Sequence, residues 1–285
     1  MTPTVFAAIG PVVHHPFQFG FHIGKFPIEF TGFGIAVVLA FVVAQFIAQE
    51  EMRRVGADPT PIADMIFGAV VGGLLGAKLY FVVILGNWNA LFTRGGFVFW
   101  GGLIGGAIGV LIIARKKHVP LWRTLEVGAV SLAAAYAVGR TGCWAVGDDY
   151  GRPWNGPFAV QFPEGAPPST AGMMTKEFGL PFPPGTDPNA VVAVHPTQLY
   201  EVAMGLVMFA VLWRMRKHKH AEGWLFGVWA ILAGVERFCI EFFRAKDDRF
   251  GFGLTLAQII AIVAVGVGVV ILRMRRATAT SAVAA

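Results

Sequence analysis

The sequence predicts an all-α polytopic membrane protein of seven transmembrane helices, with its N-terminus outside and its C-terminus in the cytoplasm. Hydrophobic residues make up 55% of the 285 residues and charged residues only 14%, whereas a soluble domain carries about 25% charged residues. The 36 glycines are typical of membrane helices that pack closely. The basic residues behind the net charge of +6 cluster between apolar runs, which favours loops facing anionic lipid over a nucleic-acid surface.

The N-terminal segment and the cysteines limit the possibilities further. Residues 1–24 contain no Lys or Arg, so the basic region that opens a signal peptide is missing. Residues 1–31 are expected to form an extended external arm within a single integral membrane domain that spans 1–285. Cys143 and Cys239, the two cysteines, show neither a disulfide framework nor metal-ligand spacing. We expect no metal and no cofactor.

The first three predicted spans cover about Gly32–Gln49, Pro61–Leu85 and Phe97–Ala114. The first ends near the basic pair at 53–54, which marks the cytoplasmic side. Lys78 lies in the outer part of the second span, where it either reaches the surface or points into a cavity. Glycines recur every four residues in the second and third spans and predict close packing. They are Gly68, Gly72, Gly76, Gly101, Gly105 and Gly109.

The later spans flank the one long extramembrane segment. The fourth, about Leu125–Gly142, leads outward into residues 143–194, whose Pro and Gly content predicts an irregular external cap. The fifth begins at HPTQLYE, where Pro196 suits a first helical turn. The sixth and seventh cover about Gly223–Phe243 and Leu254–Leu272.

The basic residues predict the orientation, because those in alternate connections all fall on one side. By the positive-inside rule this side is cytoplasmic, with residues 273–285 as a cytoplasmic tail. No internal repeat is clear enough to indicate a transporter built of inverted halves. The basic residues are Arg53, Arg54, Arg115, Lys116, Lys117, Arg214, Arg216, Lys217, Lys219, Arg273, Arg275 and Arg276.

Three polar clusters fall at the outer face, where charged groups in a membrane require a partner or a function. Arginine offers paired donors to phosphate oxygens, so Arg140 and Arg237 point to a phospholipid head group. Acids that would otherwise neutralise them are Glu236, Glu241 and Asp148. The clusters are Arg140, Cys143, Asp148, Asp149 and Arg152; His195, Gln198 and Glu201; and Arg237, Glu241 and Arg244.

Each of these residues also has a structural explanation, and the agreement of three clusters on one face is what favours a site. The glycine repeats are explained by packing alone. The other structural alternatives are an ion pair for Arg237 with Glu241, a helix cap for His195, turn residues for Asp148 and Asp149, a surface-reaching residue for Lys78 and a packing residue for Cys143.

Four ordered motifs resemble the prolipoprotein diacylglyceryl transferase family, from the first span to the sixth. They are GGLIGG at 101–106, GR-x-G-x5-D-x2-GR at 139–152, HPTQLYE at 195–201 and RF-x2-EFFR at 237–244. The resemblance implies a seven-helix bacterial inner-membrane enzyme whose site opens to the outer face. It implies transfer of the diacylglyceryl group of phosphatidylglycerol to the lipobox cysteine thiol of a prolipoprotein, with release of glycerol phosphate.

The resemblance also implies residue roles. Arg140 and Arg237 would hold the phosphate and stabilise the leaving group. Asp148, in place of a family glutamate, and His195 complete the expected catalytic residues. The expected phosphatidylglycerol-binding residues are Arg140, Cys143, Gly151, Gln198, Glu201, Arg237, Glu241, Arg244 and Lys78, the last standing where the family tends to have Arg.

The chain departs from the family at Trp100, usually His, at Cys143, usually Asn, and at Thr31, usually Tyr. Tryptophan cannot accept the thiol proton, which leaves His195 or Asp148 for that role. A thiol of pKa about 8.5 demands little of its base. The alternatives are another acceptor for the same lipid, a covalent lipid–enzyme intermediate on Cys143, and a non-catalytic lipid-binding protein.

Overall fold

The structure is a computed structural model that describes residues 12–276, apart from 24–25, 94–95, 246–248 and 250–252. In this part of the chain it is mostly helical. Its helices are α1 (Gly32–Arg54), α2 (Pro61–Leu85), the 3-10 helix η1 (Trp88–Phe92), α3 (Phe99–Lys116), α4 (Leu121–Val146), α5 (Ala171–Phe178), α6 (Thr197–Met215), α7 (Trp224–Ile240) and α8 (Leu256–Arg275).

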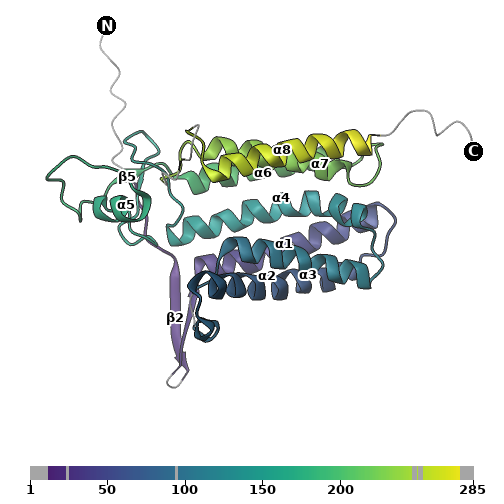
Figure 1. Cartoon of the computed structure of the whole chain (residues 1–285), viewed down its shortest axis with the longest axis horizontal. Helices are drawn as coiled ribbons and strands as arrows, with labels where there is room; N and C mark the ends of the chain where they lie inside the picture. The colour runs from purple at the N-terminus through teal and green to yellow at the C-terminus, as the bar shows by residue number, and fades with distance from the viewer. Residues whose placement is uncertain (1–11, 24–25, 94–95, 246–248, 250–252, 277–285) are drawn as a thin grey trace, which may run out of the picture.

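All helices except the short α5 and η1 run side by side as one bundle, with a cap at one end (Figure 1). Within the described residues, five of them are long and apolar enough to cross a membrane: α1, α2, α3, α6 and α8. The chain is therefore a multi-pass membrane protein. The connection expected between the sixth and seventh spans falls largely outside the described residues, as do residues 1–11 and 277–285.

The helix ends differ from the predicted spans where capping decides them. Thr31 caps α1, because its Oγ1 accepts the backbone N–H of Gly34 at 3.1 Å. The fourth helix continues beyond Gly142, so that Cys143 lies in its last turn. It ends where Gly147 takes a left-handed φ of 68° and donates its N–H to the Cys143 carbonyl.

The glycines of α2 and α3 let the two backbones approach closely. A Cβ built at Gly72 would lie 2.3 Å from the Gly105 carbonyl oxygen, and one at Gly105 would lie 2.2 Å from that of Gly72. The same crossing continues at Gly76 with Gly101, and at Gly68 with Gly109. The predicted glycine face is therefore a backbone-to-backbone contact, as small residues permit between membrane helices.

Replacing Gly105 with alanine is expected to destabilise the protein by about 2 kcal/mol, because the added methyl group must push α2 and α3 apart. Unfolding in mixed detergent micelles measures this. The matched control is Gly128→Ala in α4, where an added Cβ meets no atom within 4 Å. Equal stability of the two variants would contradict the close backbone contact.

Helix α4 occupies the centre of the bundle, where it packs against α1, α3, α6 and α7. Ala129, Val130 and Ala133 are fully buried on it and share a core with Met208 of α6 and Leu225 of α7. Small side chains along α4 thus bring its neighbours close. Because α4 is central, its last turn lies close to the ends of the neighbouring helices.

The segment between α4 and α6 is more ordered than the irregular cap that its turn-rich sequence predicted. Strand β4 (Val160–Gln161) pairs with β1 (Val12–Val13) in parallel and with β5 (Ala193–Val194) in antiparallel orientation. Tyr150, Phe162 and Met174 form a buried core there with Val194 and Ala245. The cap is therefore packed, and these strands qualify the expected all-α class.

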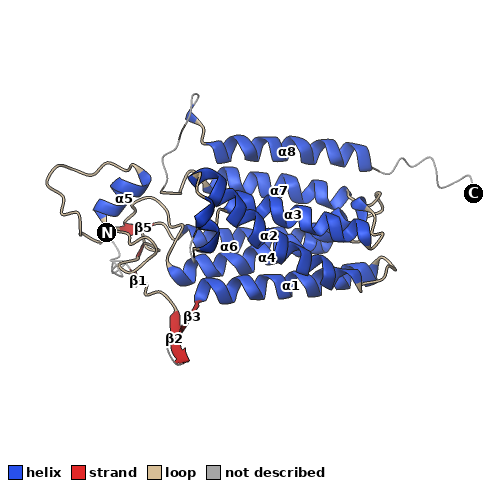
Figure 2. Cartoon of the chain, turned by 60° about the horizontal axis from the view of Figure 1, so that its bottom comes forward, coloured by secondary structure: helices blue, strands red, loops and turns tan. Residues whose placement is uncertain are grey.

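The N-terminal arm is a β-hairpin rather than an extended chain. Strands β2 (Gln18–Ile23) and β3 (Phe26–Thr31) pair in antiparallel orientation, and the hairpin projects across the helix axes from the cap end (Figures 1 and 2). The rings of Phe19 and Phe30 stack at 5.2 Å, and both are about half exposed. The hairpin therefore presents aromatic groups to its surroundings beside the cap.

Candidate active site

Two arginines and two acids form a closed network at the cap end of the bundle. Arg140 of α4 lies 2.8 Å from Asp149 and 2.8 Å from Glu201 of α6. Arg244, just after α7, lies 2.6 Å from Asp149 and 3.9 Å from Glu201. The network thus joins α4 and α6 to the segments that follow α4 and α7. Glu201 is fully buried and both arginines are largely so, which makes the ion pairs far stronger than exposed ones.

The turn after α4 directs Asp149 into this network. Asp149 has a φ of 54°, in the left-handed region that Asp enters more readily than most residues. Thr197 Oγ1 donates to the Asp149 carbonyl at 2.6 Å, and Gln198 Nε2 donates to the Asp148 carbonyl at 2.5 Å. The start of α6 therefore holds the turn in place, which gives the predicted residue Gln198 a positioning role.

Glycine is required at position 151 because the backbone there lies against His195 and Phe243. Its N–H donates to the His195 carbonyl at 2.8 Å. A Cβ at this position would meet the Phe243 carbonyl oxygen at 2.5 Å and the His195 Cβ at 2.6 Å. Any side chain here would separate the strand-like segment before α6 from the end of α7, and so open the network.

Tyr136 is a site residue that the sequence analysis missed. Its hydroxyl lies 3.3 Å from Glu201 and 2.9 Å from Glu236 of α7, and its ring lies 5.4 Å from the Arg140 guanidinium. Residues four apart share a helix face, so its position one turn before Arg140 was the available signal. Tyr136 therefore connects the arginine network to α7.

Arg237 has one guanidinium nitrogen atom in an ion pair and one that is buried without a partner among the described residues. Its Nη2 lies 2.6 Å from Glu241, which is the ion pair that the sequence analysis gave as the structural alternative for these residues. Its Nη1 is buried and has no hydrogen-bond partner among the described residues. A buried guanidinium donor without an acceptor is costly, so this atom is available to an anionic ligand.

Asp148 and Asp149 lie side by side but are in opposite electrostatic states. Burial alone would raise the pKa of Asp149, but Arg244 and Arg140 lower it to about 2. Burial, and then repulsion by Asp149, raise the pKa of Asp148 to about 6. One Asp148 oxygen is buried and has no partner in the described part of the chain. Asp148 is therefore suited to exchange a proton near neutral pH.

Cys143 faces the same acids from the last turn of α4. Its Sγ lies 3.5 Å from Arg140 Nη1 and 4.0 Å from Asp149. Potential metal-ligand atoms of Cys143, Asp148 and Asp149 lie within 4.8 Å of one another. Because two guanidinium groups already neutralise Asp149, this grouping is better explained as part of the arginine network than as a cation site.

His195 and Lys78 have their nearest partners elsewhere. The His195 ring stacks on Trp154 with centroids 4.2 Å apart, and its Nδ1 lies 3.3 Å from the Tyr200 hydroxyl. Burial lowers its pKa, so the ring is neutral at pH 7. Lys78 donates to the Thr93 carbonyl at 2.7 Å, beside η1. His195 thus braces the cap, and Lys78 ties α2 to the loop that follows it.

Replacing Glu201 with glutamine is expected to destabilise the protein by about 3 kcal/mol, because it removes a buried counter-charge from Arg140 and Arg244. Detergent unfolding measures the loss. The matched control is Glu222→Gln, whose partner Arg123 lies 2.7 Å away in a pair that is about one-third exposed. That substitution should cost less than about 1 kcal/mol, and the reverse order would contradict the network.

Comparisons with known proteins agree on one family. Residues 18–274 match the family model described as prolipoprotein diacylglyceryl transferase. A Clostridium tetani protein named phosphatidylglycerol–prolipoprotein diacylglyceryl transferase is 29% identical over 244 residues, which cover 83% of this chain and 90% of the relative. A protein of the same name from Corynebacterium diphtheriae is 29% identical, over 87% of this chain and 88% of the relative. Another from Xanthomonas oryzae pv. oryzae is 30% identical, over 83% of this chain and 84% of the relative.

Proposed function

The chain belongs to the prolipoprotein diacylglyceryl transferase family, and from this membership we propose that it transfers a diacylglyceryl group from phosphatidylglycerol to a prolipoprotein. The acceptor is the lipobox cysteine thiol, and glycerol phosphate leaves, as the first step of bacterial lipoprotein maturation. The observation that carries the proposal is the meeting of Arg140 and Arg244 at the end of the bundle. Such paired guanidinium groups suit a phosphate anion.

The proposed topology has seven membrane helices in the bacterial inner membrane, with α4 and α7 crossing as well. The position of α4 and α7 inside the bundle, where α4 packs against four other helices, supports this proposal. Basic residues occupy the last turns of α1, α3, α6 and α8, which favours a cytoplasmic position for those ends. The arm at 1–31 and the cap at 143–194 then lie outside and the tail at 273–285 inside, within one domain.

In the proposed reaction, Arg140 and Arg237 bind the lipid phosphate, together with Arg244, which shares Asp149 with Arg140. The substrate thiol sulfur attacks the glycerol carbon of the diacylglyceryl group, and the bond from that carbon to the phosphate oxygen breaks. A thioether forms, and negative charge grows on the departing phosphate. Preorganised guanidinium donors stabilise such charge, and we assign one of them to Arg237 Nη1, which has no hydrogen-bond partner within the described part of the chain.

We assign the thiol proton to Asp148 rather than to His195. Trp100, at the position where the family usually has His, cannot act as a base. Asp148 has a pKa near 6 and a buried oxygen atom with no partner among the residues that the structure describes, whereas the His195 ring contacts Trp154 and Tyr200. The remaining residues that we propose for the lipid site are Cys143, Gly151, Gln198, Glu201, Glu241, Arg244 and Lys78.

Purified protein in bilayers that contain phosphatidylglycerol tests the proposal with a lipobox peptide. We expect a peptide carrying a diacylglyceryl thioether and one equivalent of glycerol phosphate, both detected by mass spectrometry. A peptide with serine in place of the lipobox cysteine is the control. The proposal fails if no product forms while a conventional family member works in parallel.

The same experiment separates a second acceptor from the first. Trp100 and Cys143 replace residues usual in the family, which favours asking whether this chain modifies another thiol or hydroxyl. Glycerol phosphate released without lipidated lipobox peptide would favour that alternative. Lipid and protein mass spectrometry of cells with and without the gene would then identify the acceptor.

A further inference from the structure

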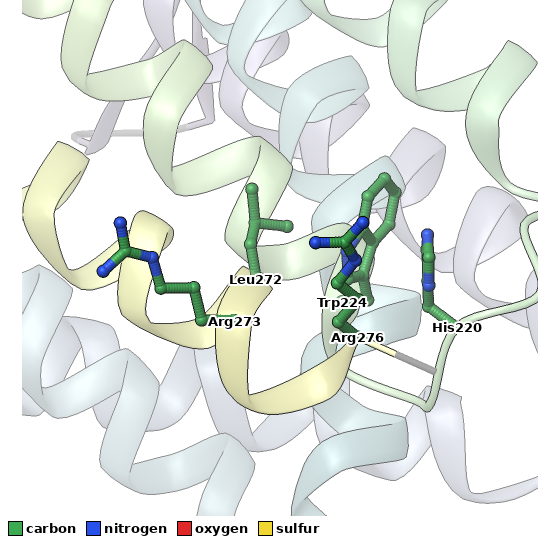
Figure 3. A pocket seen from close by; sticks show the side chains of 5 residues that line it. All are labelled: His220, Trp224, Leu272, Arg273 and Arg276. Carbon is green, nitrogen blue, oxygen red and sulfur yellow. The ribbon is translucent and has the colours of Figure 1, made fainter. Parts of the chain in front are cut away.

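The arginines beside the cavity opposite the cap point away from each other. This cavity measures about 340 Å³ and is lined by His220, Trp224, Leu272, Arg273 and Arg276. In Figure 3, Arg273 lies on one side of Leu272 and Arg276 on the other, so the two guanidinium groups do not converge on one ligand. At the cap end, by contrast, exposed residues of the hairpin formed by β2 and β3 share one chemistry.

This hairpin has one aromatic face. Successive side chains of a strand point to opposite faces, so Phe17, Phe19 and Phe21 lie on one side. Phe30 joins them because it pairs directly with Phe19. The ring centroids lie 6.0 Å apart for Phe17 and Phe19, and those of Phe19 and Phe21 lie 5.2 and 6.0 Å from that of Phe30. The four side chains are between 41% and 57% exposed, and together they form the aromatic face.

The opposite face of the hairpin is polar. Gln18 pairs with Thr31 and Gly20 with Glu29 across the two strands, and all four residues are exposed. A carboxylate such as that of Glu29 is costly in hydrocarbon. The hairpin is therefore amphipathic, as are segments that lie along a membrane surface.

The aromatic face is on the side of the hairpin along which α1 extends. A cavity of about 260 Å³ lies between the two elements and is lined by Phe30, Gly34, Ile35, Val38 and Leu39. Val38 and Leu39 are 61% and 49% exposed on a helix that is long and apolar enough to cross a membrane. The aromatic face therefore continues the exposed apolar surface of α1 around a corner.

The direction of the hairpin sets its depth in the membrane. It projects across the helix axes (Figures 1 and 2), and α1 begins at Gly32, directly after β3 ends at Thr31. The hairpin thus lies along the membrane plane where α1 enters it. Within the described residues its sheet contains β2 and β3 alone, and open strand edges are not tolerated in hydrocarbon. The hairpin must therefore rest at the depth of the lipid head groups.

We propose that the aromatic face of the hairpin rests on the lipid surface at the cap end and anchors the protein there. The four phenylalanine rings point toward the acyl chains beside α1, and the polar face with Glu29 meets water. Segments that bind at this depth carry Trp, Phe and Leu on the side that faces lipid, and a contiguous exposed apolar patch marks such a contact. The anchor does not depend on the proposed reaction.

The base of the hairpin is joined to the end of α4. Phe17 donates its N–H to the Ala145 carbonyl at 2.7 Å, and its own carbonyl accepts the N–H of Gly32 at 2.8 Å. A Cβ built at Gly32 would lie 2.4 Å from the Ala145 Cβ, so the two segments are in close contact. An anchored hairpin therefore fixes how far the last turn of α4 lies from the lipid surface.

Photocrosslinking of the full chain in phosphatidylcholine vesicles tests the anchor. The photoreactive residue p-benzoylphenylalanine replaces Phe21 on the aromatic face or Glu29 on the polar face, and mass spectrometry measures the lipid adducts. The label at position 21 should give about tenfold more lipid adduct than the label at position 29, because the two side chains point to opposite sides of the sheet. A label in place of Val38 on α1 is the positive control for insertion and folding.

Several results would overturn the proposal. Equal adducts at positions 21 and 29, or none at position 21 while position 38 reacts, would mean that the aromatic face does not contact lipid. Crosslinks from position 21 to a second copy of the chain would assign the face to a protein interface. Loss of the lipid adduct to an added lipobox peptide would assign it to that peptide. If the variant at position 21 does not fold, a label in place of Phe19 serves instead and should show the same excess over position 29.

Discussion

Replacing Arg140 with lysine is expected to lower the rate of diacylglyceryl transfer by about 10³-fold. Lysine keeps the positive charge but has one ammonium group, whereas Arg140 uses separate nitrogen atoms for Asp149 and Glu201. The variant cannot hold the network and a phosphate with the geometry of a guanidinium. Product formation from phosphatidylglycerol and a lipobox peptide measures the loss.

The matched control for this prediction is Arg123→Lys. Arg123 lies on the same helix, α4, and pairs with Glu222 at the far end of the bundle. Its replacement should change the rate less than about twofold, since this pair lies far from the site and lysine keeps its charge. Similar losses in the two variants would mean that the effect of Arg140→Lys comes from the stability of α4 rather than from the site.

Replacing Asp148 with asparagine is expected to lower kcat by about 10²- to 10³-fold, because the amide cannot accept the thiol proton. In the unchanged protein the rate should rise with pH through about 6, where Asp148 becomes ionised. The variant should lose this rise. Rates measured from about pH 5 to 8 with saturating lipid provide the comparison.

Asp148→Asn should lower the rate, but it should raise the stability of the folded protein at neutral pH. The pKa of Asp148 is near 6 in the folded protein, and the ordinary value of 3.8 applies to the unfolded chain. Between pH 3.8 and 6 the folded protein therefore binds more protons than the unfolded chain. Its stability therefore falls as pH rises through this window, and Asp148→Asn removes that fall. Asp187→Asn, at an exposed turn of the cap, is the control. A variant that loses both stability and activity would indicate a structural role.

The sequence predicted the helical framework because apolar length and glycine spacing are local signals. The Pro61–Leu85 span was predicted to the residue, and the glycine repeats became the α2–α3 contact. The hairpin was not predicted, because its pairing joins Gln18 to Thr31 in a stretch that was read as an extended arm. The cap core was also missed, since its contacts link residues far apart in the chain.

The sequence predicted which polar residues gather at one end of the bundle better than it predicted which of them pair. Arg140, Glu201 and Arg244 meet as expected from three clusters at one face. Asp148 and Asp149 could not be told apart from their neighbours in the sequence, because the left-handed φ of Asp149 decides which carboxylate reaches the arginines. Tyr136 was missed because its only signal is its position one turn before Arg140, and its two carboxylate partners come from α6 and α7, far away in the sequence.

The network of Arg140, Arg244, Asp149 and Glu201 has two positive and two negative groups, so its charges balance without a ligand. A phosphate that takes a guanidinium from Asp149 exchanges one anion for another. Only molecules in which Asp149 has turned away are competent, and the measured Kd exceeds the intrinsic one by the inverse of their fraction. Because ion pairs are replaced rather than added, lipid affinity at this site should depend little on salt concentration.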